Sequence, residues 1–506
     1  MSRTIKIIFV LAVIAGCAWL QFLLDDGLGS GWPAVVVRNW QQFGLFQLHG
    51  KLVMNTAGFG AVASPVVYSG MSPVCLYPAY FTAQLFAWTG LDTMAFQILM
   101  AALVFWAVWR LLGRDNIALT VAAVAVLCPG YGRWLKLLDP NAISVLLGLP
   151  YIVIVVAVLK KPRLGFASVA GLLMLTLAFI SLNWTTAWVL GPCTLLLLGL
   201  PQINRRAASV FIVLAGACSL LFVIGSALVR AGGGHVGTNN FGWFIRGYTW
   251  GNVGYGVGLT TGKAFIRLGF VNLVALLPLL AAAGMVAAKH FRPGEKKSWF
   301  ALSPLALTVL EIVFMRNYFG HHPWMAAPVL LAGLIFSMVL LRAQKENPAT
   351  ALGRKTHGFL LPATALLCFL YGLAVVGFFR AHELNGLALA GLVSHHTARS
   401  ECIVIVTNLD PQTAKIAPQI EYHVDRRVLV VDDLEHLPAG SGRIVILSAV
   451  PADGALALRA QVSGGDAAFQ PLMQKMCAWF TRVIARRQPG DRTDYAGTYF
   501  LYEAKP

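Results

Sequence analysis

The sequence predicts a polytopic α-helical membrane protein of about eleven transmembrane helices, with a small extracytoplasmic α/β domain at its carboxyl end. Of the 506 residues, 58% are hydrophobic and only 12% are charged, and the mean hydropathy is +0.70. A soluble domain carries about 25% charged residues. Apolar runs of about 20 residues, long enough to cross the core of a bilayer, recur up to about residue 379. These observations predict a multi-pass protein of a bacterial inner membrane.

The first predicted span, residues 5–24, follows Arg3 and Lys6, so the amino terminus is expected in the cytoplasm. A cleaved signal peptide is the alternative, because Ile14–Cys17 resembles a lipoprotein cleavage box. The apolar run continues beyond this box, which favours an uncleaved span. The further predicted spans are 93–112, 116–134, 141–159, 164–182, 185–201, 208–229, 270–288, 298–315, 323–341 and 358–379.

The first outer loop, residues 25–92, is too polar and too rich in Gly and Pro for a clean span. Residues 33–48 within it predict an interfacial helix with Trp40 and Phe43 against lipid. Residues 74–89 are apolar but short, and they predict a surface or re-entrant helix on the outer side.

A second outer loop, residues 230–269, is rich in Gly, Asn and aromatic residues. Loops of this length without regular structure are typical of lids or binding loops. An interfacial aromatic belt is the alternative interpretation of the same residues.

The net charge of +18 is explained by orientation in a membrane. Lys and Arg gather in the short connections expected inside, for example Lys160, Lys161, Arg205 and Arg206, as the positive-inside rule requires. Nucleic acid is therefore not an expected partner. An odd number of spans places the carboxyl end in the periplasm.

The transmembrane domain is predicted to end at residue 379, and residues 380–506 predict an extracytoplasmic α/β domain. Short apolar strands that alternate with helices suggest a parallel sheet covered on both faces. The predicted strands are 402–406, 428–431, 444–447 and 498–503, with a helix at 467–487. Neither a GxGxxG nor a GxxxxGK[ST] motif occurs there, so no nucleotide site is expected.

Three carboxylates are the candidate catalytic residues. Asp25 and Asp26 end the first span, and Asp139 follows the third. Ionisable groups at a membrane boundary are functional candidates, and a carboxylate can act as a general base. The structural alternatives are that the acidic pair solvates a helix end and that Asp139, before Pro140, caps the next helix.

Basic and acidic side chains on the same outer side are candidate substrate ligands. Arg133 and Lys136 could hold a lipid phosphate, because Arg offers a bidentate fork and Lys a point charge, or they could anchor the interface. Glu311 lies about one turn inside the outer end of its predicted span, and its alternative role is an ion pair with Arg316.

The sequence leaves the metal question open. The eight cysteines are scattered without a CxxC motif, so they predict neither a zinc site nor a disulfide framework. His321 and His322 together with two acids would suit a divalent cation, and a loop cap is the alternative.

This pattern resembles the GT-C superfamily of membrane glycosyltransferases. It is most similar to glycosyltransferase family 39, with the bacterial relatives of protein O-mannosyltransferases and the lipid A aminoarabinose transferase. The resemblance rests on Asp25 and Asp26 after the first span, on Arg38–Gly44 (RNWQQFG) in the outer loop, and on Asp139. Two features depart from the family. Met71–Val74 (MSPV) replaces a His/Lys-Pro-Pro-Leu stretch, and Asp-Asp replaces the commoner Asp-Glu, which leaves open which acid is the base.

The resemblance implies transfer of a sugar from a polyprenyl-phosphate donor to a lipid, glycan or protein acceptor outside the cytoplasm. Asp25 or Asp26 would be the base, and Asp139 would orient the acceptor or hold a metal. Substrate-binding roles would fall to Arg38, Arg133, Lys136, Glu311, Arg316, His321 and His322. No cofactor is required, a divalent metal stays open, and membrane lipids are the remaining expected partners.

Two alternatives from other classes stay open. A transporter or flippase for a lipid-linked or polar solute would place its charges along a path at mid-membrane. A non-catalytic assembly factor would depend on residues 380–506 and would not need the acids.

Overall fold

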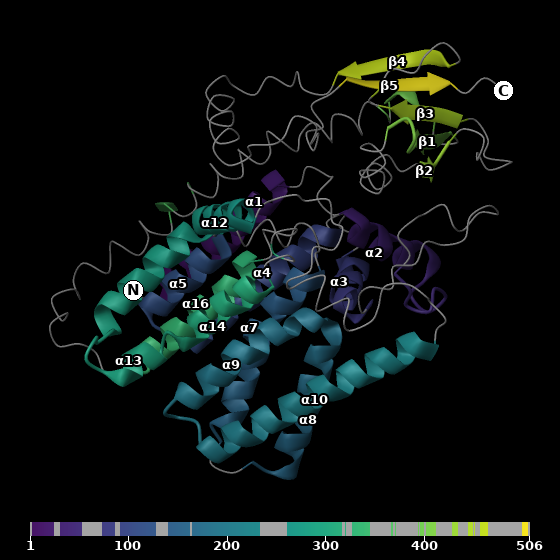
Figure 1. Ribbon diagram of the computed structural model, residues 1–506. Helices are drawn as coiled ribbons and strands as arrows, with labels where there is room; N and C mark the ends of the chain where they lie inside the picture. The colour runs from purple at the N-terminus through teal and green to yellow at the C-terminus, as the bar shows by residue number, and fades with distance from the viewer. Residues whose placement is uncertain are drawn as a thin grey trace. The chain divides into compact units, whose positions relative to one another are not determined.

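The computed structural model describes residues 3–24, 31–52, 73–86, 92–127, 140–161, 164–232, 261–315, 319, 326–344, 366–367, 370, 393, 395–398, 401–410, 428–433, 444–448, 450, 456–463 and 498–503 (Figure 1). The chain divides into two compact units. The first, the helical unit, comprises Met1–Trp19, Met94–Leu135 and Pro140–Gly372. The second, the mixed unit, comprises Leu20–Thr93, Lys136–Asp139 and Leu373–Pro506.

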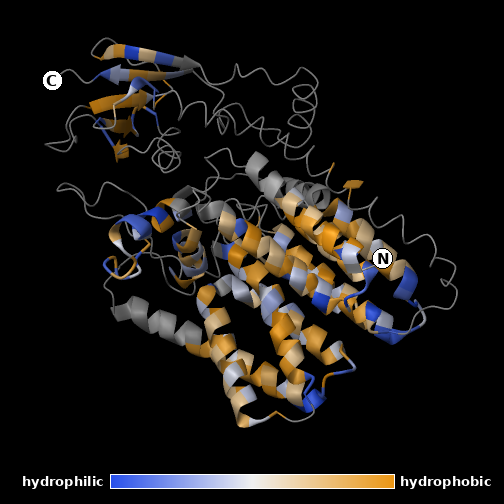
Figure 2. Ribbon diagram, turned by 180° about the vertical axis from the view of Figure 1, so that it is seen from behind, coloured by the Kyte–Doolittle hydropathy of each residue, from blue (hydrophilic) through white to orange (hydrophobic). Residues whose placement is uncertain are grey.

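The helical unit is built from helices that follow the apolar runs of the sequence. They are most of α1 (Arg3–Leu24) and α4 (Asp92–Leu111), then α5 (Asn116–Leu127), α7 (Pro140–Leu159), α8 (Phe166–Leu182), η4 (Trp184–Thr186), α9 (Ala187–Gly199), α10 (Arg205–Gly232), α12 (Thr261–His290), α13 (Lys296–Phe300), α14 (Ser303–Phe314) and α16 (Ala326–Arg342). Figure 2 shows hydrophobic residues along these helices and hydrophilic residues at several of their ends. This distribution lets the helices pack together through apolar side chains.

Helix α16 is the core of the helical unit. All of its side chains from Ala326 to Leu341 are buried except the partly buried Leu330. It packs against α7, α9, α12 and α14. A helix that is apolar all round is stable only when neighbours cover every face, and these four helices do so.

Glycines set the closest approaches between these helices. A Cβ at Gly333 of α16 would lie 2.9 Å from the Thr308 Cβ of α14 and 3.3 Å from the Leu305 Cα. A Cβ at Gly148 of α7 would lie 2.6 Å from the Val189 Cγ1 of α9. Only a residue without a side chain allows such packing, because interiors leave no spare volume.

The mixed unit contains a small helical part with an aromatic centre. Helix α2 (Gly31–Phe43) packs against α3 (Tyr77–Phe86), which continues from the 3₁₀ turn η2 (Pro73–Leu76). Trp40 is fully buried, donates a 2.9 Å hydrogen bond from Nε1 to the Lys51 carbonyl, and meets Tyr77 and Tyr80 edge-on. The expectation that Trp40 faces lipid is therefore wrong, because aromatic partners from α3 cover it.

The mixed unit also contains a five-stranded sheet. Its strands are β1 (Cys402–Val406), β2 (Val428–Val431), β3 (Ile444–Ser448), β4 (Ala457–Ser463) and β5 (Thr498–Glu503), in the order β2-β1-β3-β5-β4. Strand β1 pairs in parallel with β2 and β3, whereas β5 is antiparallel to β3 and β4. The predicted all-parallel sheet is therefore a mixed one, and β4 was not predicted. The predicted helix at 467–487 lies outside the described residues.

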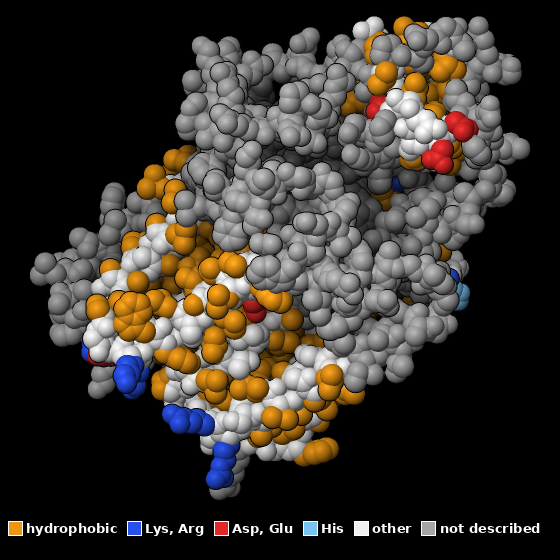
Figure 3. Space-filling view, in the orientation of Figure 1, with side chains coloured by type: hydrophobic (Ala, Val, Ile, Leu, Met, Phe, Trp, Pro, Cys, Tyr) orange, Lys and Arg blue, Asp and Glu red, His pale blue; other side chains and the backbone are white. Residues whose placement is uncertain are grey.

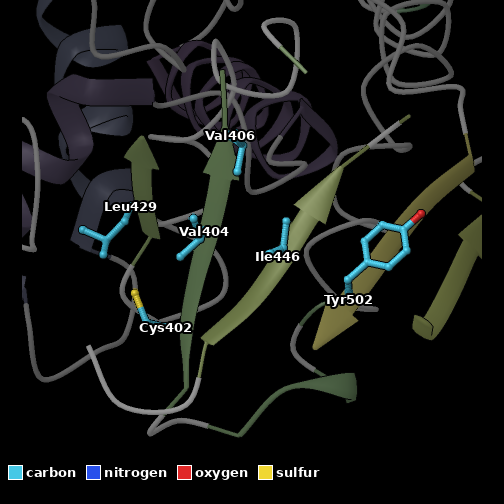
Figure 4. Close-up of a cluster of buried hydrophobic side chains, with 6 residues drawn as sticks. All are labelled: Cys402, Val404, Val406, Leu429, Ile446 and Tyr502. Atoms are coloured by element: carbon cyan, nitrogen blue, oxygen red, sulfur yellow. The ribbon is translucent and has the colours of Figure 1, made fainter. Parts of the chain in front are cut away.

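One face of this sheet forms a hydrophobic core. Cys402, Val404 and Val406 alternate along β1 and share that face with Leu429, Ile446 and Tyr502 (Figure 4). Alternate residues of a strand point to the same side, which is why every second residue of β1 belongs to this cluster. The other residues of β1 are also buried, as expected for a strand covered on both faces.

The prediction of about eleven spans is wrong for the described part of the chain. There, judged by length and composition, one helix, Asn141–Leu159, is long and apolar enough to cross a membrane. Of its most apolar stretch, 72% is buried within the fold. The other apolar segments of the described helices, for example Ala95–Leu111 in α4 and Leu276–His290 in α12, run 10–17 residues each. The multi-pass inner-membrane location, with a cytoplasmic amino terminus and a periplasmic carboxyl domain, depended on those spans and is wrong with them.

The physical reason is that an apolar run in a sequence does not fix the length of a continuous helix. The predicted span 298–315 is divided into α13 and α14 by a turn at Ala301–Leu302. Pro304 starts the second helix, because a residue without an N–H fits the first helical turn. The predicted span 185–201 is shortened in the same way, since it opens with the 3₁₀ turn η4 before α9.

Candidate functional site

A buried polar cluster lies where the amino-terminal ends of α7 and α9 meet. Asn183, just before η4, donates a 2.7 Å hydrogen bond from Nδ2 to the Asn141 Oδ1 at the start of α7. The Thr185 hydroxyl lies 3.4 Å from the Asn141 carbonyl oxygen, and the Thr186 hydroxyl donates to the Asn183 carbonyl at 2.7 Å. All four side chains are buried. We call these four residues the polar cluster.

The polar cluster holds two helix ends in a fixed arrangement. A buried amide or hydroxyl destabilises a fold unless it is hydrogen-bonded, so these contacts define where α7 begins relative to η4 and α9. Pro140 opens α7, and Asp139 immediately precedes it in the sequence. One residue beyond Ala187, the Trp188 ring packs against Phe319, with the ring centroids 4.9 Å apart.

Glu311 is a partly buried carboxylate of the helical unit, and burial, with no charged group among the described residues, accounts for its altered acidity. It lies in α14, and its Oε1 reaches the backbone of α9 at Gly191, where a Cβ would be only 2.9 Å away. Its Oε2 is buried and has no hydrogen-bond partner among the described residues. Burial raises the pKa of the Glu311 carboxyl from 4.5 to about 8. A neutral carboxylic acid at this position can donate a hydrogen bond to a ligand oxygen.

The surroundings of Glu311 on α14 are apolar. Leu310, Val313 and Phe314 are exposed hydrophobic side chains on the same helix. Figure 3 shows a carboxylate set among hydrophobic side chains on this face of the helices. An acid in such a setting suits an amphiphilic ligand whose polar group reaches the carboxyl and whose apolar part covers the leucine and phenylalanine.

Arg38, a predicted substrate ligand, lies in α2 of the mixed unit. Its side chain is partly buried, and its neighbours Asn39 and Trp40 are fully buried. The helix continues through a turn with left-handed residues at Gly44, His49 and Gly50. The aromatic packing around Trp40 therefore holds the stretch that carries Arg38.

The remaining predicted site residues lie outside the described residues. They are Asp25, Asp26, Arg133, Lys136, Asp139, Arg316, His321 and His322. Most of the second outer loop, from 233 to 260, lies outside them as well. The convergence of these side chains at one site stays a prediction. Within the described ranges, no group of three or more His, Cys, Asp or Glu could hold a metal ion.

Sequence reasoning missed the polar cluster. The signal was present, because Asn183–Thr186 (NWTT) interrupts two apolar runs and Asn141 opens a third. Such residues predict helix boundaries, whereas the pairing of Asn183 with Asn141 across 42 positions of the chain emerges only in three dimensions.

No protein-family model matches this chain, and no curated protein matches it either.

Proposed function

We propose that the protein is a glycosyltransferase that moves a sugar from a polyprenyl-phosphate donor to a hydroxyl-bearing acceptor, as its resemblance to the GT-C superfamily implies. The observation that carries the proposal is the polar cluster, which fixes the start of α7 directly after Asp139. A catalytic carboxylate must be held in a defined position, and a fixed helix start that follows Asp139 in the sequence is consistent with that role.

The apolar exterior of the helical unit supports a donor with a hydrocarbon tail. Met174 of α8 is 71% exposed, and Val213 of α10 is 70% exposed. Burial of apolar surface favours binding by about 25 cal/mol per Å². Such faces suit a polyprenyl chain or the acyl chains of membrane lipids.

The proposed chemistry is a displacement at the anomeric carbon. Asp25 or Asp26 takes the proton of the acceptor hydroxyl as the acceptor oxygen bonds to that carbon. The bond from the anomeric carbon to the phosphate oxygen breaks, and polyprenyl phosphate leaves with the electron pair. Asp139 orients the acceptor.

The leaving phosphate carries negative charge that the protein must stabilise. Arg38, Arg133, Lys136 and Arg316 are the candidate partners for it. Glu311, neutral when protonated, donates a hydrogen bond to a substrate oxygen. His321 and His322 with the acids would suit a divalent cation, so transfer should be measured with and without a metal chelator.

The test is sugar transfer or release by the purified full chain with a panel of polyprenyl-phosphate sugars. We expect activity in the wild type, and none in an Asp25→Asn, Asp26→Asn double variant. Asp115→Asn is the matched control, because Asp115 is not one of the candidate site residues and pairs with Arg342. Undiminished transfer by the double variant would remove the acidic pair from the mechanism.

A transporter or flippase is the second candidate, and one observation favours it. Glu311 lies in the last turn of the apolar helix α14, and a protonatable group in an apolar helix is typical of a transport path. Lipid scrambling by vesicles that contain the wild type but not Glu311→Gln, without sugar transfer, would favour this candidate.

A further inference from the structure

Exposed cations gather at three turns of the helical unit. They are Lys160, Lys161, Arg205, Arg206, Lys296 and Lys297, which we call the basic rim. None of them forms an ion pair within the described part of the chain, whereas nearby Arg292 pairs with Glu295 and Arg342 with Asp115. Positive charge on the basic rim is therefore available to a partner.

Packing places these turns at one edge of the helical unit. Helices α7 and α9 run in the same direction, since Asn141 meets Asn183 and Thr185 at one end and Gly148 approaches Val189 further along. Their carboxyl ends, at Leu159 and Gly199, thus lie on the same side.

A second contact brings α13 to this edge. A Cβ at Gly199 would lie 2.8 Å from the Phe300 Cε1 and 2.7 Å from the Leu340 Cδ2. The end of α9, which leads into Arg205 and Arg206, therefore meets the helix that begins with Lys296 and Lys297.

Exposed aromatic side chains accompany the basic rim. Phe166 at the start of α8 is 90% exposed, and Trp299 beside Lys297 is 59% exposed. The Trp299 ring is held in place because its Nε1 donates a 2.9 Å hydrogen bond to the Pro293 carbonyl. Cations next to exposed aromatic rings are the pattern of a surface at the polar boundary of lipid.

Away from the basic rim the exterior is apolar. Helix α8 carries no charged residue, and α10 carries none between Arg206 and Arg230. Val213, Leu220 and Leu221 of α10 are exposed hydrophobic side chains. Figure 3 shows Lys and Arg side chains along the edge of a largely hydrophobic face.

We propose that the basic rim binds the head groups of an anionic lipid surface. The lipid phosphates meet the six cations, Phe166 and Trp299 lie at the polar boundary, and the apolar exterior of α8 and α10 contacts acyl chains. This contact does not depend on how many helices cross a bilayer. It is also separate from the proposed sugar transfer, which uses other residues.

The test is flotation of the purified full chain with vesicles of phosphatidylcholine alone or of phosphatidylcholine with phosphatidylglycerol, at low and high salt. In the variant Lys160→Gln, Lys161→Gln, Arg205→Gln, Arg206→Gln, we expect the preference for anionic vesicles to fall at least about tenfold. Phe166→Ser should lower flotation with both kinds of vesicle. Its side chain is exposed, so the fold is expected to tolerate the change.

The matched control keeps the charge: Lys160→Arg, Lys161→Arg, Arg205→Lys, Arg206→Lys should float as the wild type does. Equal flotation of the charge-removed variant and the wild type with anionic vesicles would overturn the proposal. A salt-sensitive dimer in sedimentation, lost in the charge-removed variant and present without vesicles, would instead assign the basic rim to a second copy of the chain. Sugar transfer measured in parallel separates failure of this proposal from failure of the proposed function.

Discussion

The Glu311 carboxyl occupies the space that a side chain at Gly191 would need. A Cβ at Gly191 would lie 2.9 Å from the Glu311 Oε1 and 3.4 Å from the Leu307 Cδ2, so the glycine in α9 forms a niche for an acid from α14. In the part of the chain that the structure describes, the buried Oε2 has no hydrogen-bond partner in that niche. An acid held in this way is uncharged over part of the neutral range, and the protein's stability depends on pH as a result.

Stability should fall as pH rises from 4.5 to about 8. In this window the unfolded chain releases the Glu311 proton while the folded chain keeps it, so rising pH favours unfolding. The loss is on the order of a few kcal/mol across the whole window. Glu311→Gln should abolish this part of the pH dependence of stability, as measured by thermal unfolding at pH values below, within and above the window.

Gly191→Ala is the companion to that experiment. The added methyl should displace the flexible Glu311 side chain towards solvent, which lowers the pKa of its carboxyl and flattens the slope. An identical slope in the wild type and Glu311→Gln would show that another group titrates there.

Glycines at two helix positions should respond to alanine with opposite signs. Gly333→Ala would place a methyl against Thr308, which is buried and donates a 2.8 Å hydrogen bond to the Pro304 carbonyl. We expect a loss of about 1–3 kcal/mol in the free energy of unfolding. A Cβ at Gly284 in α12 would have no atom within 4 Å, so Gly284→Ala should raise the free energy of unfolding by up to about 1 kcal/mol. Chemical unfolding of both variants checks the signs, and a gain at Gly333 would contradict the close packing of α14 on α16.

The turn after α2 should depend on a contact with one hydroxyl. Gly50 has a φ of +64°, and a Cβ there would lie 2.7 Å from the Tyr77 Oη. Gly50→Ala should destabilise by about 1–2 kcal/mol from backbone strain alone, with the steric contact added. Tyr77→Phe removes that oxygen, so the double variant should recover the steric part. A double-mutant cycle measures this coupling, and strict additivity would exclude the contact.

Asp115 should stabilise the start of α5 in two ways. Its Oδ1 accepts a 2.8 Å hydrogen bond from the Ala118 N–H, and Arg342 donates to both carboxylate oxygens. Asp115→Ala should cost about 1–2 kcal/mol, whereas Asp115→Asn should keep most of the cap and lose only the exposed ion pair, about 1 kcal/mol or less. Equal losses would mean that the cap contributes nothing.

The pH dependence of Asp115 should run opposite to that of Glu311. Partial burial acts to raise the pKa of the Asp115 carboxyl. Hydrogen bonds from Arg342 and the Ala118 N–H, with the positive charges of Arg342 and Lys289, outweigh burial and hold that pKa below its ordinary value of 3.8. The stability that ionised Asp115 contributes is therefore fully present above pH 3.8 and is lost as pH falls through the lowered pKa. Acid unfolding of wild type and Asp115→Asn should converge at low pH.

The strands show how much of the sheet can be predicted from the local sequence pattern. The residues 402–406, 428–431 and 444–447 were expected as strands from their apolar, β-branched composition, and β1, β2 and β3 occupy these positions. The strand β4 (ALRAQVS) has no such run, because it lies at the edge of the sheet and includes an irregular register between Leu458 and Ala460. Pairing with β5 rather than its own hydropathy makes it a strand.

The sequence by itself determined which segments are apolar, where charge interrupts them, and which short runs form β1, β2, β3 and β5, since these depend on neighbours within a few residues. The tertiary structure decided the rest. It buried Trp40 under Tyr77 and Tyr80, divided α13 from α14, and gave Glu311 a niche at Gly191. It also joined Asn141 to Asn183. Each of these outcomes depends on contacts between residues far apart in the chain, and hydropathy along a sequence carries no information about which distant partner will cover a given side chain.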